Sequence, residues 1–298
     1  MKKLLFASLL FAICFSVAAF AQIPVETLVQ ISRAEDELRF DKTLEELLKN
    51  SDAKIRTRAA LAAGRIGDER AVPALAALLE NDKDETVRAM AAFALGEIES
   101  IEGADAIYKV LSNAKNHPSV RARAAEAAGK IAAANAKDEK AKTLGKAVLE
   151  TLAFEDRKRS ASYDNVIELA LTAVLRARPE GAETVVAEFA RAYTPEIRAS
   201  ALNTLARLRA KNANERARAS LQNDKDAVVR ANAARVLGAA EDKDAFELLL
   251  NAATNDADSR VRVSAIRSLG SLKDARAAGR LLERGEKLLA DYKKSKFA

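Results

Sequence analysis

One pattern recurs seven times along this chain and restricts it to a stacked helical array. Its clearest copy spans residues 52–67 and reads D-A-K-I-R-T-R-A-A-L-A-A-G-R-I-G. Each copy has a β-branched apolar anchor, and the seven anchors are Ile55, Val87, Val120, Val166, Ile197, Val229 and Val261. Successive anchors lie 31 to 33 residues apart, except for one step of 46. A period near 32 is typical of helical hairpins that stack into a solenoid.

Each anchor begins a stripe that we expect to be buried. Alanine stands four residues past every anchor, at Ala59, Ala91, Ala124, Ala170, Ala201, Ala233 and Ala265. An offset of four keeps a residue on the same helix face, and alanine there leaves room for a second helix to pass close. Glycine stands nine past five of the anchors, at Gly64, Gly96, Gly129, Gly238 and Gly270. Because glycine costs roughly 1 kcal/mol inside a helix, its recurrence favours close packing or a helix exit.

Two further positions mark the helix starts. Three residues before the anchors stand Asp52, Asp84, His117, Tyr163, Thr194, Asp226 and Asp258. The aspartates, Thr194 and His117 are predicted N-caps, because a side-chain acceptor there satisfies unpaired backbone N–H groups. Pro118 and Pro195 follow directly, at the first helical position, where proline is well tolerated. An arginine follows six of the seven anchors, at Arg56, Arg88, Arg121, Arg198, Arg230 and Arg262.

The combined pattern D-x-x-[VI]-R-x-x-A-[AL]-x-x-[LA]-[GA] resembles HEAT repeats, specifically the short HEAT-like class named after phycobilisome lyases. The resemblance covers about residues 52–282. It implies an all-α, armadillo-like superhelical solenoid of about seven helical hairpins.

The resemblance also implies a polar ladder formed by the arginines and aspartates of successive repeats. The residues that would form it are Arg56, Arg88, Arg121, Arg198, Arg230 and Arg262, with Asp52, Asp84, Asp226 and Asp258. By spacing, we expect each cap aspartate to pair with the arginine four residues later, as Asp226 with Arg230. A basic strip that grips an acidic partner is the alternative for this arginine row.

Four segments are predicted along the chain. Residues 1–21 resemble a signal peptide, with two lysines, an apolar run and an A-x-A cleavage site at residues 19–21. An uncleaved membrane anchor is the alternative. Residues 22–50 are predicted to form an N-terminal helical cap, residues 51–282 the solenoid, and residues 283–298 a basic C-terminal helix end. We expect a bacterial protein exported to the periplasm or the exterior, with no membrane span after signal cleavage.

The third repeat carries about 14 extra residues, within residues 132–165. We expect a longer second helix over residues 137–154, followed by an exposed loop that contains Arg157, Lys158, Arg159 and Tyr163. Insertions in solenoids often lie on the binding face, so this loop is a candidate binding site. A solvated spacer is the alternative.

The composition argues against a catalytic or metal site. His117 is the single histidine, and Cys14, the single cysteine, lies in the predicted signal peptide. A histidine-based catalytic constellation or a zinc site would need more such residues, so we predict no enzymatic activity, no cofactor and no metal. The net charge is +6, but 43 acidic residues are interspersed among 49 basic ones, which argues against a nucleic-acid partner.

We therefore predict a monomeric, non-enzymatic scaffold of the cell envelope, whose second helices line a concave surface that holds a protein or peptide. One alternative is a HEAT module associated with an exported cyclophilin-type prolyl isomerase whose catalytic domain is absent here. Residues 31–40 and 58–73 look similar to HEAT regions that precede such domains. A bilin lyase-like role is a remoter alternative, based on the name of the repeat class alone.

Overall fold

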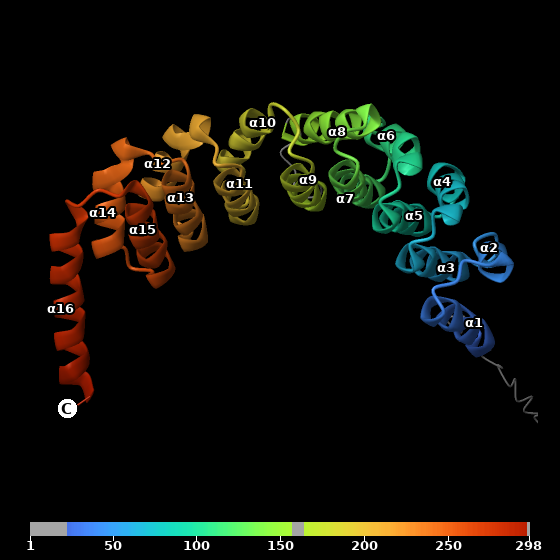
Figure 1. Cartoon of the computed structure of the whole chain (residues 1–298), viewed down its shortest axis with the longest axis horizontal. Coiled ribbons are helices and arrows are strands. Elements are labelled where there is room, and N and C mark those ends of the chain that lie inside the picture. Colours follow the sequence, from blue (N-terminus) through green and yellow to red (C-terminus); the bar gives the residue numbers. More distant parts are fainter. Residues whose placement is uncertain (1–22, 157–163, 297–298) are drawn as a thin grey trace, which may run out of the picture.

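The computed structural model describes residues 23–156 and 164–296, and these residues form helices and no strand. The helices make two layers of one arched solenoid (Figure 1). The inner layer contains α1 (Val25–Asp36), α3 (Ala53–Ile66), α5 (Glu85–Ile98), α7 (Pro118–Ala134), α9 (Asp164–Ala177), α11 (Pro195–Leu208), α13 (Ala227–Ala239) and α15 (Ser259–Leu272). The outer layer contains α2 (Lys42–Leu47), α4 (Val72–Asn81), α6 (Ala104–Ser112), α8 (Glu139–Asp156), α10 (Ala182–Glu188), α12 (Asn214–Asn223) and α14 (Phe246–Asn255). The predicted all-α solenoid is confirmed.

The concave side of the arch is lined by the first helix of each repeat, from α1 to α15 (Figure 1). The second helices, α2 to α14, lie on the convex side. Our prediction that the second helices line the concave surface is therefore wrong. Both helices of a hairpin carry one apolar stripe, and periodicity alone does not tell which layer curves inward.

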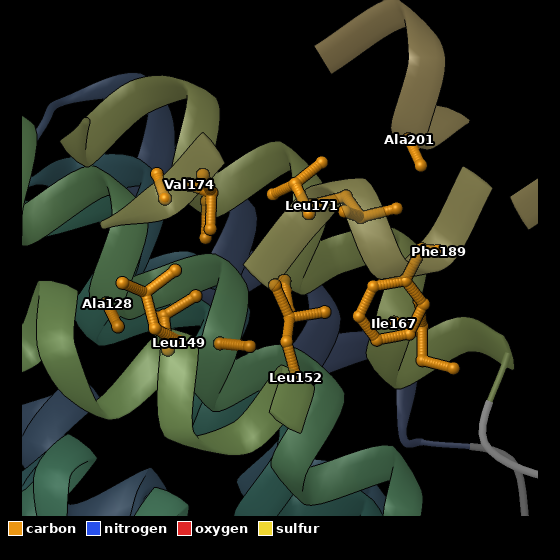
Figure 2. Packing of buried hydrophobic residues seen from close by; sticks show 14 of the residues in the cluster. Ala128, Leu149, Leu152, Ile167, Leu171, Val174, Phe189 and Ala201 are labelled. Atoms are coloured by element: carbon orange, nitrogen blue, oxygen red, sulfur yellow. The ribbon is translucent and has the colours of Figure 1, made fainter. Parts of the chain in front are cut away.

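The anchor and alanine rows lie in the contact between layers and between neighbouring repeats. Val87, Val120 and Ala124, for example, have no exposed side-chain area. Figure 2 shows the packing around the third and fourth repeats, where Leu149 and Leu152 of α8 lie with Leu171 and Val174 of α9. The inserted residues lengthen α8 without interrupting the continuous core.

Four of the repeated glycines allow inner helices to touch. A Cβ atom on Gly96 would lie 2.7 Å from the Cα atom of Ala127 on the next inner helix, and one on Gly129 would lie 2.5 Å from the Cα atom of Ala173. Gly64 and Gly238 make equivalent approaches to Ala94 and Ser268. At Gly270, on the last inner helix, the same atom would meet nothing within 4 Å. The glycine row therefore serves repeat stacking at its first four members.

The two ends of the described chain differ. At the N-terminus, where we predicted a helical cap, Asp41 caps the short helix α2, and Ile31 and Leu44 are buried. At the C-terminus, α16 (Ala277–Lys296) packs on α14 and spans the residues on both sides of position 283. Residues 1–21, predicted as a signal peptide, lie outside the described residues.

Candidate binding surface

The arginines that follow the anchors lie at the edge where each outer helix returns to the next inner helix. Three of them form two-pronged ion pairs with an aspartate 26 residues later, Arg56 with Asp82, Arg198 with Asp224 and Arg230 with Asp256. All six nitrogen–oxygen distances lie between 2.7 and 2.9 Å. Such planar bidentate pairs fix geometry as well as adding energy.

The same loop aspartates also contact the next arginine along the solenoid. The backbone carbonyl of Asp224 accepts a hydrogen bond of 3.0 Å from Arg230, and that of Asp256 accepts one of 2.8 Å from Arg262. Each loop aspartate therefore connects the arginines of two successive repeats. Hydrogen bonds from Arg230 lower the pKa of the Asp256 carboxyl below its ordinary value, against the opposing effect of burial.

The four cap aspartates act as the predicted N-caps, but they are not the ion-pair partners of the ladder arginines that spacing indicated. Asp52, Asp84, Asp226 and Asp258 each accept a hydrogen bond from a backbone N–H in the first turn of the following helix. The predicted pairing of Asp226 with Arg230 is wrong, because Arg230 reaches Asp256 instead. A cap carboxylate turns toward the N-terminal amides of its own helix, and the arginine side chain extends to the next loop.

Three arginines of the row have other surroundings. Arg121 is buried and pairs with Glu155, which is also buried, at the end of the lengthened helix α8. Arg88 and Arg262 donate to backbone carbonyls of the preceding loop and make no ion pair with a described residue. His117 caps α7 through Nδ1, as predicted, whereas Thr194 makes no side-chain cap hydrogen bond, so its predicted capping role is wrong.

The exposed face of the inner helices forms the concave surface. Counting from each anchor at about 100° per residue, positions six and ten lie roughly opposite the buried stripe. In the N-terminal half, position six is apolar and partly exposed, at Leu61 of α3 and Phe93 of α5. Val29 of α1, 32 residues before Leu61, extends this row and is 59% exposed.

Two cationic side chains lie beside Phe93. The cationic groups of Arg123 and Lys130, both on α7, lie 5.4 and 4.9 Å from the centre of its ring. Arg123 pairs with Glu126 at 2.7 Å, and Lys130 pairs with Glu97 and Glu126. Between α3 and α5, Leu61, Met90, Thr57 and Arg58 line an open hollow of about 410 Å³.

The candidate loop residues Arg157, Lys158, Arg159 and Tyr163 lie outside the described residues. Within the described ranges, no three histidine, cysteine, aspartate or glutamate side chains gather so that they could hold a metal ion. None of the described helices combines the length and apolar character needed to cross a membrane.

The stacked hairpins and their arginine ladder define a HEAT-type solenoid, and comparison of the sequence with known families agrees. The sequence model for HEAT repeats matches residues 41–96, 73–162 and 214–287. The chain belongs to this family. No curated protein matches the chain. The similarity to HEAT regions of exported cyclophilin-type prolyl isomerases stays a prediction.

Several solved structures have a similar arrangement of helices. An engineered protein is 19% identical, with a TM-score of 0.52, over 88% of this chain and 75% of its own. The archaeal HEAT-like repeats protein from Thermococcus onnurineus NA1 is 17% identical, with a TM-score of 0.50, over 78% of this chain and 97% of its own. The complex of CpcE and CpcF of phycocyanin lyase from Nostoc sp. PCC7120 is 20% identical, with a TM-score of 0.49, over 78% and 94%. Likeness at this level of identity concerns the fold.

Proposed function

We infer that this protein is a non-enzymatic scaffold of the bacterial cell envelope, which binds a protein or peptide on the concave face of its solenoid. The observation that carries this proposal is the apolar row on the concave side of α1, α3 and α5. Val29, Leu61 and Phe93 recur every 32 residues at one helix position, and each is at least partly exposed. Exposed apolar side chains that gather on one face and are rimmed by polar groups are typical of a protein interaction site.

The surroundings of this row fit a protein ligand. The hollow beside Leu61 and Met90 offers an apolar pocket, and methionine adapts its shape to different side chains. Arg123 and Lys130 place cationic groups at the rim, beside Phe93. Aromatic and arginine side chains of this kind are enriched among residues that dominate protein–protein affinity.

The envelope location rests on the sequence of residues 1–21, with its paired lysines, apolar run and small residues at positions 19 and 21. Mass spectrometry of periplasmic or secreted material is expected to find a mature chain that begins at Gln22. Intact Met1 in cytosolic material would contradict the export proposal.

The binding face can be tested by site-specific photo-cross-linking in the bacterium that makes the protein. A photoreactive amino acid replaces Met90, beside the concave hollow, or in a matched control Ala77, which is exposed on the outer helix α4. We expect a discrete adduct with another protein from position 90 and none from position 77. Adducts from position 77 alone, or from both positions equally, would contradict binding on the concave face.

A further inference from the structure

A second feature of the concave face lies in its C-terminal half. Arg176 of α9, Arg207 of α11, Arg235 of α13 and Arg267 of α15 are all exposed. They stand six or ten residues past their anchors, the two positions that point away from the buried stripe. One arginine on each of four consecutive inner helices therefore forms a stripe along the concave side, which we call the concave arginine stripe.

These four arginines form no ion pair with any described residue. Arg235 donates one hydrogen bond, of 3.2 Å, to the side-chain oxygen of Asn232, and the other three side chains have no hydrogen-bond partner among the described residues. At position ten of α3 and α7, by contrast, Arg65 pairs with Glu35, and Lys130 with Glu97 and Glu126. The cations of the N-terminal half are thus balanced from within the chain, and those of the C-terminal half are not.

Carboxylates are scarce in the helices that carry the stripe. Beyond the first turn of α9, α11, α13 and α15, Glu168 is the only acidic residue in the four helices. A surface lined by one sign of charge attracts ligands of the opposite sign and raises the rate at which they associate. Ser200 and Asn203 of α11 and Ser264 of α15 are partly exposed beside the arginines and supply groups that can hydrogen-bond to a peptide backbone.

The composition of these helices distinguishes between kinds of anionic ligand. α9, α11, α13 and α15 contain no Phe, Tyr or Trp. Proteins that bind single-stranded nucleic acid stack its bases on aromatic side chains. The guanidinium group matches a carboxylate in a planar two-pronged geometry, and the ladder of this same chain shows that pairing at Arg198 and Arg230.

We propose that the concave arginine stripe binds an acidic segment of a partner protein, held extended with a carboxylate at every third residue. Neighbouring packed helices lie about 8–10 Å apart. A polyproline II segment has three residues per turn and rises about 3.1 Å per residue, so every third side chain points the same way about 9 Å further on. The repeat of such a segment matches the step between neighbouring inner helices whose arginines stand at the same position, as Arg176 and Arg207 do at position ten and Arg235 and Arg267 at position six. This inference rests on the proposed function and assigns a chemistry to the partner.

The test uses the mature chain and two labelled synthetic peptides of about twelve residues. In one peptide, glutamates occupy every third position among serines and prolines, and in the other the same residues are rearranged with the glutamates in one block. Binding is followed by fluorescence anisotropy at low and at physiological salt. The variant R176Q/R207Q/R235Q/R267Q is compared with R191Q/K211Q/K225Q/K243Q, which removes four exposed cations from the connecting segments between helices.

We expect the periodic peptide to bind more tightly than the blocked one, with an affinity that falls as salt rises. The stripe variant should bind about tenfold or more weakly, and the control variant within about twofold of the parent. Equal losses in both variants, no binding of the periodic peptide at low salt, or tighter stripe-dependent binding of a single-stranded oligonucleotide would overturn the proposal. Cross-linking from position 90 tests the proposed function independently, because that position lies in the other half of the face.

Discussion

Arg230 on α13 holds the carboxylate of Asp256, in the loop after α14, with two hydrogen bonds of 2.9 Å each. The same guanidinium donates to the backbone carbonyl of Asp224 at 3.0 Å, in the loop that precedes α13. One side chain therefore connects the loops on both sides of its repeat. Because both ion-pair partners are largely buried, with exposed fractions of 17% and 12%, the contact is weakly screened by solvent.

Replacement of Arg230 by alanine should destabilise the solenoid. The change removes the ion pair and leaves the Asp256 carboxylate partly buried, so we expect a loss of about 1.5–3 kcal/mol in the free energy of unfolding. Urea or thermal unfolding measures it. The control is Arg260→Ala, which removes an exposed pair with Asp258 and should leave stability nearly unchanged. An Arg230→Ala variant that unfolds like the parent would contradict the structural role of the ladder.

The Asp256 carboxyl should make stability depend on pH in the acid range. Its pKa in the folded protein is lowered by hydrogen bonds from Arg230, whereas in the unfolded chain it is about 3.9. As pH falls below about 4, the unfolded chain takes up the proton first, and the stability contributed by the ionised carboxylate is lost. The difference in unfolding free energy between the parent and Asp256→Asn should therefore be largest near neutral pH and shrink in acid. A difference that stays constant down to about pH 2.5 would be inconsistent with this coupling.

Two glycines at the same helix position should respond oppositely to alanine. In Gly96→Ala the new Cβ would lie 2.7 Å from the Cα atom of Ala127, so we expect a loss of about 1–3 kcal/mol from overpacking. In Gly270→Ala nothing lies within 4 Å, and the better helix propensity of alanine should add up to about 1 kcal/mol. Chemical denaturation of both variants provides the comparison. Similar losses at both positions would show that the glycine row is not explained by repeat stacking.

The buried pair of Arg121 and Glu155 should be more sensitive than the partly exposed pairs. Each of the two residues is 1% exposed. Glu155→Ala leaves a buried guanidinium without its carboxylate, and such a change costs about 3–5 kcal/mol. The double change of Arg121→Met and Glu155→Leu removes both charges and should restore most of that stability. If the double variant is as unstable as Glu155→Ala, the loss comes from packing in α8 and not from an unpaired charge.

Much of the fold is predictable from the sequence because three independent rows repeat with one period. The anchors, the alanines and the cap aspartates each mark the same helices, and the structure confirms the helical starts after Asp52, Asp84, Asp226 and Asp258. Helix α11 also begins directly after Thr194, but the buried hydroxyl of Thr194 has no hydrogen-bond partner among the described residues. A capping residue type at the right position does not ensure that its side chain turns toward the helix.

The ion pairs of the ladder were harder to predict, although the sequence contains their signal. The pattern D-x-D stands at residues 82–84, 224–226 and 256–258, in the three loops whose first aspartate accepts the arginine pair. The spacing between Arg230 and Asp226 suggested a local pair, whereas the actual partner lies 26 residues further along the chain. Such a contact depends on how one hairpin folds back on itself, so the D-x-D pattern marks the acceptor loop but does not tell which arginine reaches it.

The concave face could not be assigned from periodicity, because inner and outer helices both have one apolar stripe. Because the first helices lie on the concave side of the arch (Figure 1), the positions six and ten residues past each anchor can be assigned to the concave surface. They hold Leu61 and Phe93 in the N-terminal half, and the concave arginine stripe in the C-terminal half. The residues of the concave surface can therefore be identified in the sequence only when the direction in which the solenoid curves is known.

On the proposed function, the ladder arginines hold the repeats together, whereas the concave side chains bind the partner. The most direct test measures both properties in the same variants, using the protein cross-linked from position 90 as ligand. Arg230→Ala should lower the melting temperature and leave the dissociation constant nearly unchanged, because its guanidinium is engaged within the solenoid. Phe93→Ser should raise the dissociation constant about tenfold or more, with a smaller effect on melting. The reverse result, with binding lost in Arg230→Ala and retained in Phe93→Ser, would contradict the account.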